Sequence, residues 1–191
     1  MKNLAKQTHK VRIIAGNHKG RRIDILERPG LRPSPDRVRE TLFNWLQFLL
    51  SGAHILDAFA GSGVMGLEAL SRGASSAIFF EKDPQIAQQI SQTLTQWREN
   101  HASVKIGDAL SFSANRNPFD LIFIDPPFMD NLHQQALDKF SQSIWLKDNG
   151  LLYIETPFAL TELTLPPNTH WHKQSKAGRL HFGLIKRDAH A

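Results

Sequence analysis

The chain contains no cysteine among its 191 residues, which excludes disulfide bonds and thiolate metal sites. It also has no apolar run of the length that a membrane span needs, and residues 1–6 lack the apolar stretch of a signal peptide. His170 and His172 could share one face of a strand, but no acidic residue clusters with them in the sequence. We therefore expect a cytoplasmic protein with no membrane partner and no bound metal.

Acidic residues are scarce at both ends of the chain. Residues 1–40 contain 11 Lys or Arg against 4 Asp or Glu, and residues 171–191 contain 5 against 1. Residues 41–170 have the opposite balance, with 7 against 13. A basic N-terminal segment is typical of a contact with nucleic acid, although an excess of Lys and Arg also occurs on ordinary solvated surfaces.

Asp125-Pro126-Pro127-Phe128 follows the apolar run 121–124, which is typical of a buried strand. Two prolines cannot continue a sheet ladder, because each lacks an N–H and has a fixed φ. The rigid turn leaves a carboxylate, a carbonyl and an aromatic ring at the carboxyl end of the strand, where open α/β sheets bind ligands. The Asp125 carboxylate and the Pro126 carbonyl can accept both hydrogens of an amino group. An ordinary turn would also use these residue types, but the set suits chemistry on a nucleobase amine.

A second motif joins a short strand to a glycine turn and a helix. Gly61, Gly63 and Gly66 match the pattern of dinucleotide-binding folds. Electrostatics favours another cofactor, because Asp57 would repel a pyrophosphate but attract the ammonium and sulfonium groups of S-adenosylmethionine. Glycine also permits close backbone approach to a ligand at a helix N-terminus. Backbone contacts with this cofactor are expected from Phe59, Ala60, Gly61, Ser62 and Gly63.

Two further acids follow strand-like segments. Glu81 is placed to accept hydrogen bonds from the ribose hydroxyls of the cofactor, and Asp108 is placed near its adenine amino group. Each acid taken alone is a common turn or strand-end residue. Together with Asp57 and Asp125 they put four acids at the ends of four successive strands, which predicts one shared site.

Strand-like and helix-like segments alternate after residue 50, which predicts an α/β fold with a parallel sheet covered by helices on both faces. A final antiparallel pair closes the chain. Before it, residues 11–14 and 21–25 predict a β-hairpin that must dock elsewhere, because its apolar content is small. We expect a basic arm and hairpin over residues 1–30 and one domain over 31–191. Strands are expected near 54–58, 77–81, 103–106, 120–125, 150–155, 169–175 and 179–186, and helices near 64–72, 84–98 and 131–144.

The glycine turn, the acids and the Pro-Pro turn, in that order and spacing, resemble the motifs of class I S-adenosylmethionine-dependent methyltransferases that act on an amino nitrogen. The block from Arg32 to Leu46, joined to residues 14–16 and 19–22, is similar more narrowly to the bacterial 16S rRNA (guanine-966-N2)-methyltransferase family, RsmD. The likeness runs from about Val11 to Arg187. That family usually has Thr where Ser34 stands, a swap that keeps the hydroxyl.

This resemblance implies a Rossmann-like class I methyltransferase fold, with a seven-stranded, mostly parallel sheet and the last strand inserted antiparallel. It also implies methylation of the exocyclic N2 of a guanine in 16S rRNA of an assembling small ribosomal subunit. The catalytic residues would be Asp125, Pro126, Pro127 and Phe128, whose ring would stack on the guanine. A monomer is expected. RNA contacts are expected from the basic residues Lys10, Arg12, Lys19, Arg21, Arg22, Arg32 and Arg37.

Two alternatives stay open at this point. A DNA adenine-N6 methyltransferase would use the same Asp-Pro-Pro-aromatic site, although the chain offers little room for a target-recognition segment. A non-catalytic RNA-binding assembly factor on the same fold would account for the basic ends of the chain without any role for Asp125.

Overall fold

The computed structural model describes residues 9–26, 35–114 and 117–189. Its strands are β1 (His9–Arg12), β2 (Arg22–Ile25), β3 (His54–Asp57), β4 (Ser76–Glu81), β5 (Ala102–Ile106), β6 (Phe119–Ile124), β7 (Leu146–Thr156), β8 (Thr169–Ala177) and β9 (Leu180–Arg187). Its helices are α1 (Asp36–Trp45), α2 (Val64–Ser71), α3 (Pro84–Trp97) and α4 (His133–Phe140), with short 3-10 turns η1 (Ala109–Ser111), η2 (Phe128–Asp130) and η3 (Leu160–Glu162).

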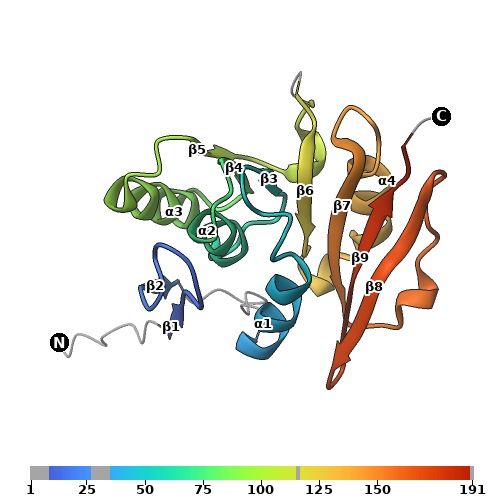
Figure 1. Ribbon diagram of the computed structural model, residues 1–191, viewed down its shortest axis with the longest axis horizontal. Coiled ribbons are helices and arrows are strands. Elements are labelled where there is room, and N and C mark those ends of the chain that lie inside the picture. The colour runs from blue at the N-terminus through green and yellow to red at the C-terminus, as the bar shows by residue number, and fades with distance from the viewer. Residues whose placement is uncertain (1–8, 27–34, 115–116, 190–191) are drawn as a thin grey trace.

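Seven strands form one sheet in the order β5-β4-β3-β6-β7-β9-β8 (Figure 1). The pairs from β5 to β7 are parallel, whereas β9 is antiparallel to both of its neighbours, β7 and β8. Crossover helices place successive parallel strands with their carboxyl ends at one edge of the sheet. The predicted sheet, with its last strand inserted antiparallel, is confirmed.

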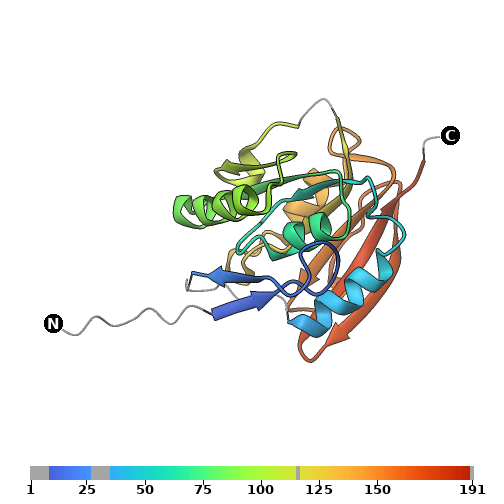
Figure 2. The same cartoon turned by 60° about the vertical axis from the view of Figure 1, so that its left-hand side comes forward.

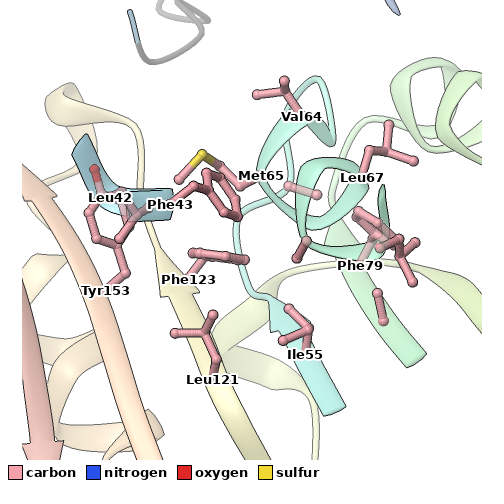
Figure 3. Packing of buried hydrophobic residues seen from close by; sticks show 14 of the residues in the cluster. Leu42, Phe43, Ile55, Val64, Met65, Leu67, Phe79, Leu121, Phe123 and Tyr153 are labelled. Carbon is pink, nitrogen blue, oxygen red and sulfur yellow. The ribbon is translucent and has the colours of Figure 1, made fainter. Parts of the chain in front are cut away.

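Side chains of the central strands alternate between two apolar clusters, as the period of two residues in a strand requires. Ile55, Phe123 and Tyr153 belong to the cluster that includes residues of α1, α2 and α3 on one face. Figure 3 shows the part of this cluster that involves α1 and α2 from close by. Leu56 and Ile122 pack with α4 on the other face. Helices therefore cover both faces of the sheet, as predicted. Among the described residues, no helix is long and apolar enough to cross a membrane.

The antiparallel hairpin of β1 and β2 docks through its loop on α2. The fully buried Glu68 carboxylate accepts hydrogen bonds from the Ile14 and Ala15 N–H groups, at 2.8 and 3.0 Å. Gly16 has φ +83°, and a Cβ there would lie 1.8 Å from the Ser71 carbonyl oxygen, so only glycine fits this contact. The docking predicted for the hairpin is confirmed.

The same loop also contacts the end of α3. His18 stacks on Trp97 with ring centroids 4.3 Å apart, and its Nε2 lies 2.6 Å from a Glu99 carboxylate oxygen. Figures 1 and 2 show the hairpin and α1 toward the end of the molecule at which β6 finishes. The boundary expected at residue 30 lies outside the described residues, so the division into arm and domain stays a prediction.

Candidate active site: an acidic row at the carboxyl edge of the sheet

Four carboxyl groups stand at the last residue of four neighbouring strands, β4, β3, β6 and β7, or one residue from it, namely Glu81, Asp57, Asp125 and Glu155. Each stands two residues after a member of the apolar cluster that faces α1, α2 and α3, respectively Phe79, Ile55, Phe123 and Tyr153. Because strand side chains alternate with a period of two, all four carboxyl groups project on that same face of the sheet. The fold thus builds a continuous acidic row.

Asp57 lies under the start of α2 and is 3% exposed. Its Oδ2 accepts a hydrogen bond of 3.0 Å from the Gly66 N–H, in a helix whose N-cap residue, Gly63, has φ +73° and supplies no side-chain cap. Burial raises the pKa of Asp57 to about 7; the bond from Gly66 lowers it, and the nearby Glu81 raises it further. A positive ligand at this position would favour the ionised form.

Glu81 is tied to the glycine turn. Its Oε2 accepts from the Gly61 N–H and its Oε1 from the Asp83 N–H, both at 2.8 Å. Burial raises the pKa of Glu81 despite these two bonds. The carboxylate therefore holds the backbone of the predicted cofactor turn in place, in addition to any contact with a ribose.

Asp125 is half-buried at the head of the Pro-Pro turn. Burial first, and then the charges of Glu155 and Asp57, raise the pKa of Asp125 well above its usual range. After the two prolines the chain forms η2, in which Phe128 is 45% exposed. Asp125 and an accessible aromatic ring are therefore presented at the same strand end, as the sequence predicts.

Aromatic and histidine side chains flank this turn. The Phe128 ring lies 6.0 Å from that of His133, which in turn packs edge-on against Phe158 at 5.2 Å. His133 is 1% exposed, and neither of its ring nitrogens has a hydrogen-bond partner among the described residues. Burial lowers its pKa, which favours the neutral ring, and the ring packs between Phe128 and Phe158.

Glu155 is the site residue that sequence reasoning missed. It is 2% exposed, and its Oε1 accepts a hydrogen bond of 2.7 Å from the buried Tyr153 hydroxyl. Burial and the neighbouring Glu155 raise the pKa of Tyr153 well above its ordinary value. The signal was available, because Glu155 directly follows the apolar run 151–154, just as Asp125 directly follows the apolar run 121–124.

Asp108 belongs to the edge of the site and not to the buried row. It is exposed, and its side chain accepts from the Leu110 N–H at 2.9 Å, which caps η1. Beside it, Phe112 stacks on Phe80 with centroids 4.2 Å apart. An exposed acceptor next to a stacked aromatic pair is consistent with the predicted contact to an adenine, which stays a prediction.

Three of the predicted RNA-binding residues are engaged within the protein. Lys10 pairs with Asp24 at 3.0 Å, the Arg12 guanidinium lies 3.9 Å from the Asp36 carboxylate, and Arg21 lies over the Trp97 ring, 5.5 Å from its centroid. Exposed ion pairs of this kind contribute little to stability and can exchange partners.

The other described cations of the predicted RNA-binding set are more accessible for contact with RNA. Lys19, Arg22 and Arg37 are exposed, and the described part of the chain gives them no ion pair. Arg32 lies outside the described residues, as does Ser34. Within the described ranges no group of three or more His, Asp or Glu could hold a metal, and His170 pairs instead with Asp188 at 2.8 Å.

Comparison with known proteins places this site in a family. A family model described as "Conserved hypothetical protein 95" matches residues 11–186. The protein named ribosomal RNA small subunit methyltransferase D of Escherichia coli (strain K12) is 40% identical over 180 residues, which cover 94% of this chain and 91% of the relative. The protein of the same name in Haemophilus influenzae is 42% identical over 181 residues, which cover 92% of this chain and 93% of that relative.

Solved structures agree with the sequence comparison. The yhhF protein of Escherichia coli superimposes with a TM-score of 0.83 at 40% identity, covering 95% of this chain and 100% of that one. The match to the family model extends over the loop of the hairpin, the glycine turn, the Pro-Pro turn and the strand that carries Glu155. The chain therefore belongs to the ribosomal RNA small subunit methyltransferase D family.

Proposed function

We propose that this protein transfers a methyl group from S-adenosylmethionine to the exocyclic N2 of a guanine in 16S rRNA. The observation that carries the proposal is the acidic row beside the Pro-Pro turn. Burial raises the pKa values of three of its members, Asp57, Glu81 and Asp125, and neighbouring carboxyl groups raise those of Asp57 and Asp125 further, so ionising these groups costs free energy. A cofactor with an ammonium and a sulfonium group relieves that cost, whereas a pyrophosphate would increase it.

The residues present fit this cofactor. The Gly61–Gly63 turn would bring backbone close to a ligand beside the N-terminus of α2, and the exposed Asp108, with the half-buried Phe112 beside it, would hold an adenine. When bound, S-adenosylmethionine supplies an electrophilic methyl group. Glu81 would accept from the ribose hydroxyls while it continues to anchor the turn.

At the other side of the row, Asp125 and the Pro126 carbonyl would accept the two N2 hydrogens and aim the nitrogen lone pair at the methyl carbon. The target guanine has to leave its stack, at a cost of roughly a few kcal/mol. Stacking on the accessible Phe128 ring offsets part of that cost, since base–aromatic stacking contributes roughly 1–3 kcal/mol per base. Orientation and exclusion of water would then provide most of the acceleration.

Transfer of label from tritiated S-adenosylmethionine tests the proposal. The acceptors should be small-subunit particles lacking the modification, naked 16S rRNA and duplex DNA, with nucleoside analysis of the product. We expect label on guanine N2 in the particle. Label on adenine in the DNA would establish the DNA-methyltransferase alternative, and RNA binding without label on any acceptor would establish the non-catalytic one.

Glu81→Ala should weaken binding of S-adenosylmethionine, measured by calorimetry. Hydrogen bonds to a charged group contribute roughly 1.5–3 kcal/mol, so the dissociation constant should rise by roughly 10- to 150-fold. The variant loses both the ribose acceptor and the anchor of the Gly61 and Asp83 N–H groups. Glu81→Gln keeps an acceptor and should lose less; equal affinity of Glu81→Ala and wild type would remove Glu81 from the cofactor site.

Replacing Lys19, Arg22 and Arg37 with Gln should weaken RNA binding at low salt. The slope of log K against log salt should become shallower by about two to three units, at roughly 0.7–0.9 per lost phosphate contact. These three cations are exposed and unpaired within the described residues, so their loss should leave the docked loop intact. S-adenosylmethionine affinity should not change.

A matched control removes three cations from the β8–β9 hairpin instead, by substituting Lys173, Lys176 and Arg179, which are also exposed. An equal change of slope in both triple variants would show that RNA contact is not specific to the hairpin and the start of α1. An unchanged slope with weaker cofactor binding in the first variant would identify the hairpin as a packing element for the core.

A further inference from the structure

Glu155 lies beside Asp125 across two parallel strands. Ile124 of β6 is the register partner of Ile154 in β7, so the next residue on each strand is the acid. Both follow an aromatic residue of the same cluster by two positions, and those aromatics, Phe123 and Tyr153, have ring centroids 6.1 Å apart. The two carboxyl groups therefore project from adjacent strand ends on one face of the sheet.

The environment of Glu155 is built around its carboxylate. Oε1 receives the Tyr153 hydroxyl at 2.7 Å, and both side chains are buried, at 2% and 0% exposure. A hydroxyl that donates to a carboxylate stabilises its ionised form. Burying an acid costs free energy unless the acid is hydrogen-bonded. The orientation of the amine by Asp125 and Pro126, described above, does not involve Glu155.

We propose that Glu155, oriented by Tyr153, is a positioning residue that controls the protonation of Asp125. Glu155 does not contact the substrate; its negative charge raises the proton affinity of its neighbour on β6. The inference rests on the proposed methyl transfer and extends it by naming the path of the released proton.

The chemistry requires such a path. With S-adenosylmethionine bound, formation of the bond from N2 to the methyl carbon and loss of the bond from that carbon to sulfur would leave the positive charge on the amine nitrogen. Asp125, beside the negative charge of Glu155, would then take up a proton from this acidic amine. One N2–H bond breaks, its electron pair stays on nitrogen, and the proton forms an O–H bond on Asp125.

Other charged groups surround the pair. Asp57, on β3, adds to the negative potential at Asp125, and Glu81 acts on Asp57 in turn. From β9, His181 lies opposite Thr156, one residue beyond Glu155. The cation of α1 buried on this face, Arg39, is engaged by Asp36 at 2.6 Å and by Glu68 at 3.6 Å.

Titration of Asp125 tests the inference without any substrate. The protein is labelled with ¹³C at aspartate carboxyl groups, and the Asp125 signal is assigned by its loss in Asp125→Asn. In Glu155→Gln the Asp125 midpoint should move to lower pH by about one unit or more, because a like charge has been removed. Tyr153→Phe should move it in the same direction by less, and Glu40→Gln, an exposed acid on α1, should leave it unchanged.

Turnover provides the second measurement. With label transfer to small-subunit particles, the acid limb of the pH profile of kcat should shift to lower pH in Glu155→Gln. The plateau should fall by about tenfold, because a less basic Asp125 is a weaker proton acceptor. KM for S-adenosylmethionine should change little.

The outcomes separate the two proposals. An unchanged titration midpoint of Asp125 in a folded Glu155→Gln protein overturns the inference. A lower plateau of kcat with an unshifted acid limb of its pH profile also overturns it, because that result indicates a purely structural role for Glu155. If Glu155→Gln does not fold, Tyr153→Phe decides by the same criterion. A shifted midpoint in a protein that methylates no acceptor leaves the coupling standing and refutes the proposed function.

Discussion

Asp125→Ala should reduce methyl transfer by roughly 100-fold or more, because the variant loses an orienting acceptor and a proton acceptor together. Fold stability should be maintained. Removal of a half-buried acid from a row of acids relieves repulsion with Asp57 and Glu155, which already raise the pKa of Asp125. S-adenosylmethionine affinity should change much less than turnover. The measurement is single-turnover label transfer with calorimetric binding in parallel.

Asp125→Asn separates the two roles. Its amide carbonyl can still accept a hydrogen bond from the guanine amine, but it cannot take up a proton at neutral pH. If Asp125→Asn has activity close to wild type while Asp125→Ala loses most of it, Asp125 only orients the amine. Equal losses in both would assign proton transfer, and near-normal turnover in both would remove the Pro-Pro turn from the chemistry.

Glu68→Gln should lower the free energy of unfolding by about 3–5 kcal/mol, because breaking a buried ion pair leaves charge uncompensated. Glu68 and Arg39 are both 0% exposed, with 3.6 Å between their charged atoms, and Arg72 Nε donates to the same carboxylate at 2.7 Å. Glu68 also accepts the Ile14 and Ala15 N–H groups. The amide nitrogen of Gln would face donors only. Urea unfolding measures the loss.

A second readout shows where the loss acts. Trypsin should cut the hairpin faster in Glu68→Gln, at the exposed Lys19, Arg21 and Arg22, because the loop has lost its acceptor on α2. Glu40→Gln changes the same group at an exposed position and should stay within about 0.5 kcal/mol of wild type. Equal stability of both variants would mean that the buried network does not hold the hairpin.

Much of the fold was predictable because its signals are local. Alternating apolar segments, the glycine turn and the Pro-Pro turn each reflect backbone preferences within a few residues, and they predict the parallel sheet and the edge at which ligands bind. Element ends were less accurate: the helix expected over 131–144 is confined to His133–Phe140. There Leu132 and Ser141 are the cap residues, and the residues after Ser141 turn into β7.

Which acids belong to the acidic row depends on the order of the strands in the sheet. The order along the chain groups Asp108 with the other acids, but β5 is the edge strand, and Asp108 just after it is exposed to solvent. Glu155 lies near the end of β7, which is an interior strand between β6 and β9, and it is buried. The burial of a carboxyl group, and therefore the shift of its pKa, depends on which strands are neighbours in the sheet. The order of the strands along the chain does not reveal which strands are neighbours.

By itself, the sequence determined the class of fold, the position of the glycine and Pro-Pro turns, and the chemical groups available for an amine substrate, because these depend on residue type and short spacing. Only the tertiary structure decided that Glu68 anchors the hairpin and that Arg21 lies against Trp97. It also decided that Glu155 stands beside Asp125. Those contacts join segments tens of residues apart, and the free energy of a buried charge is set by the groups that packing brings around it.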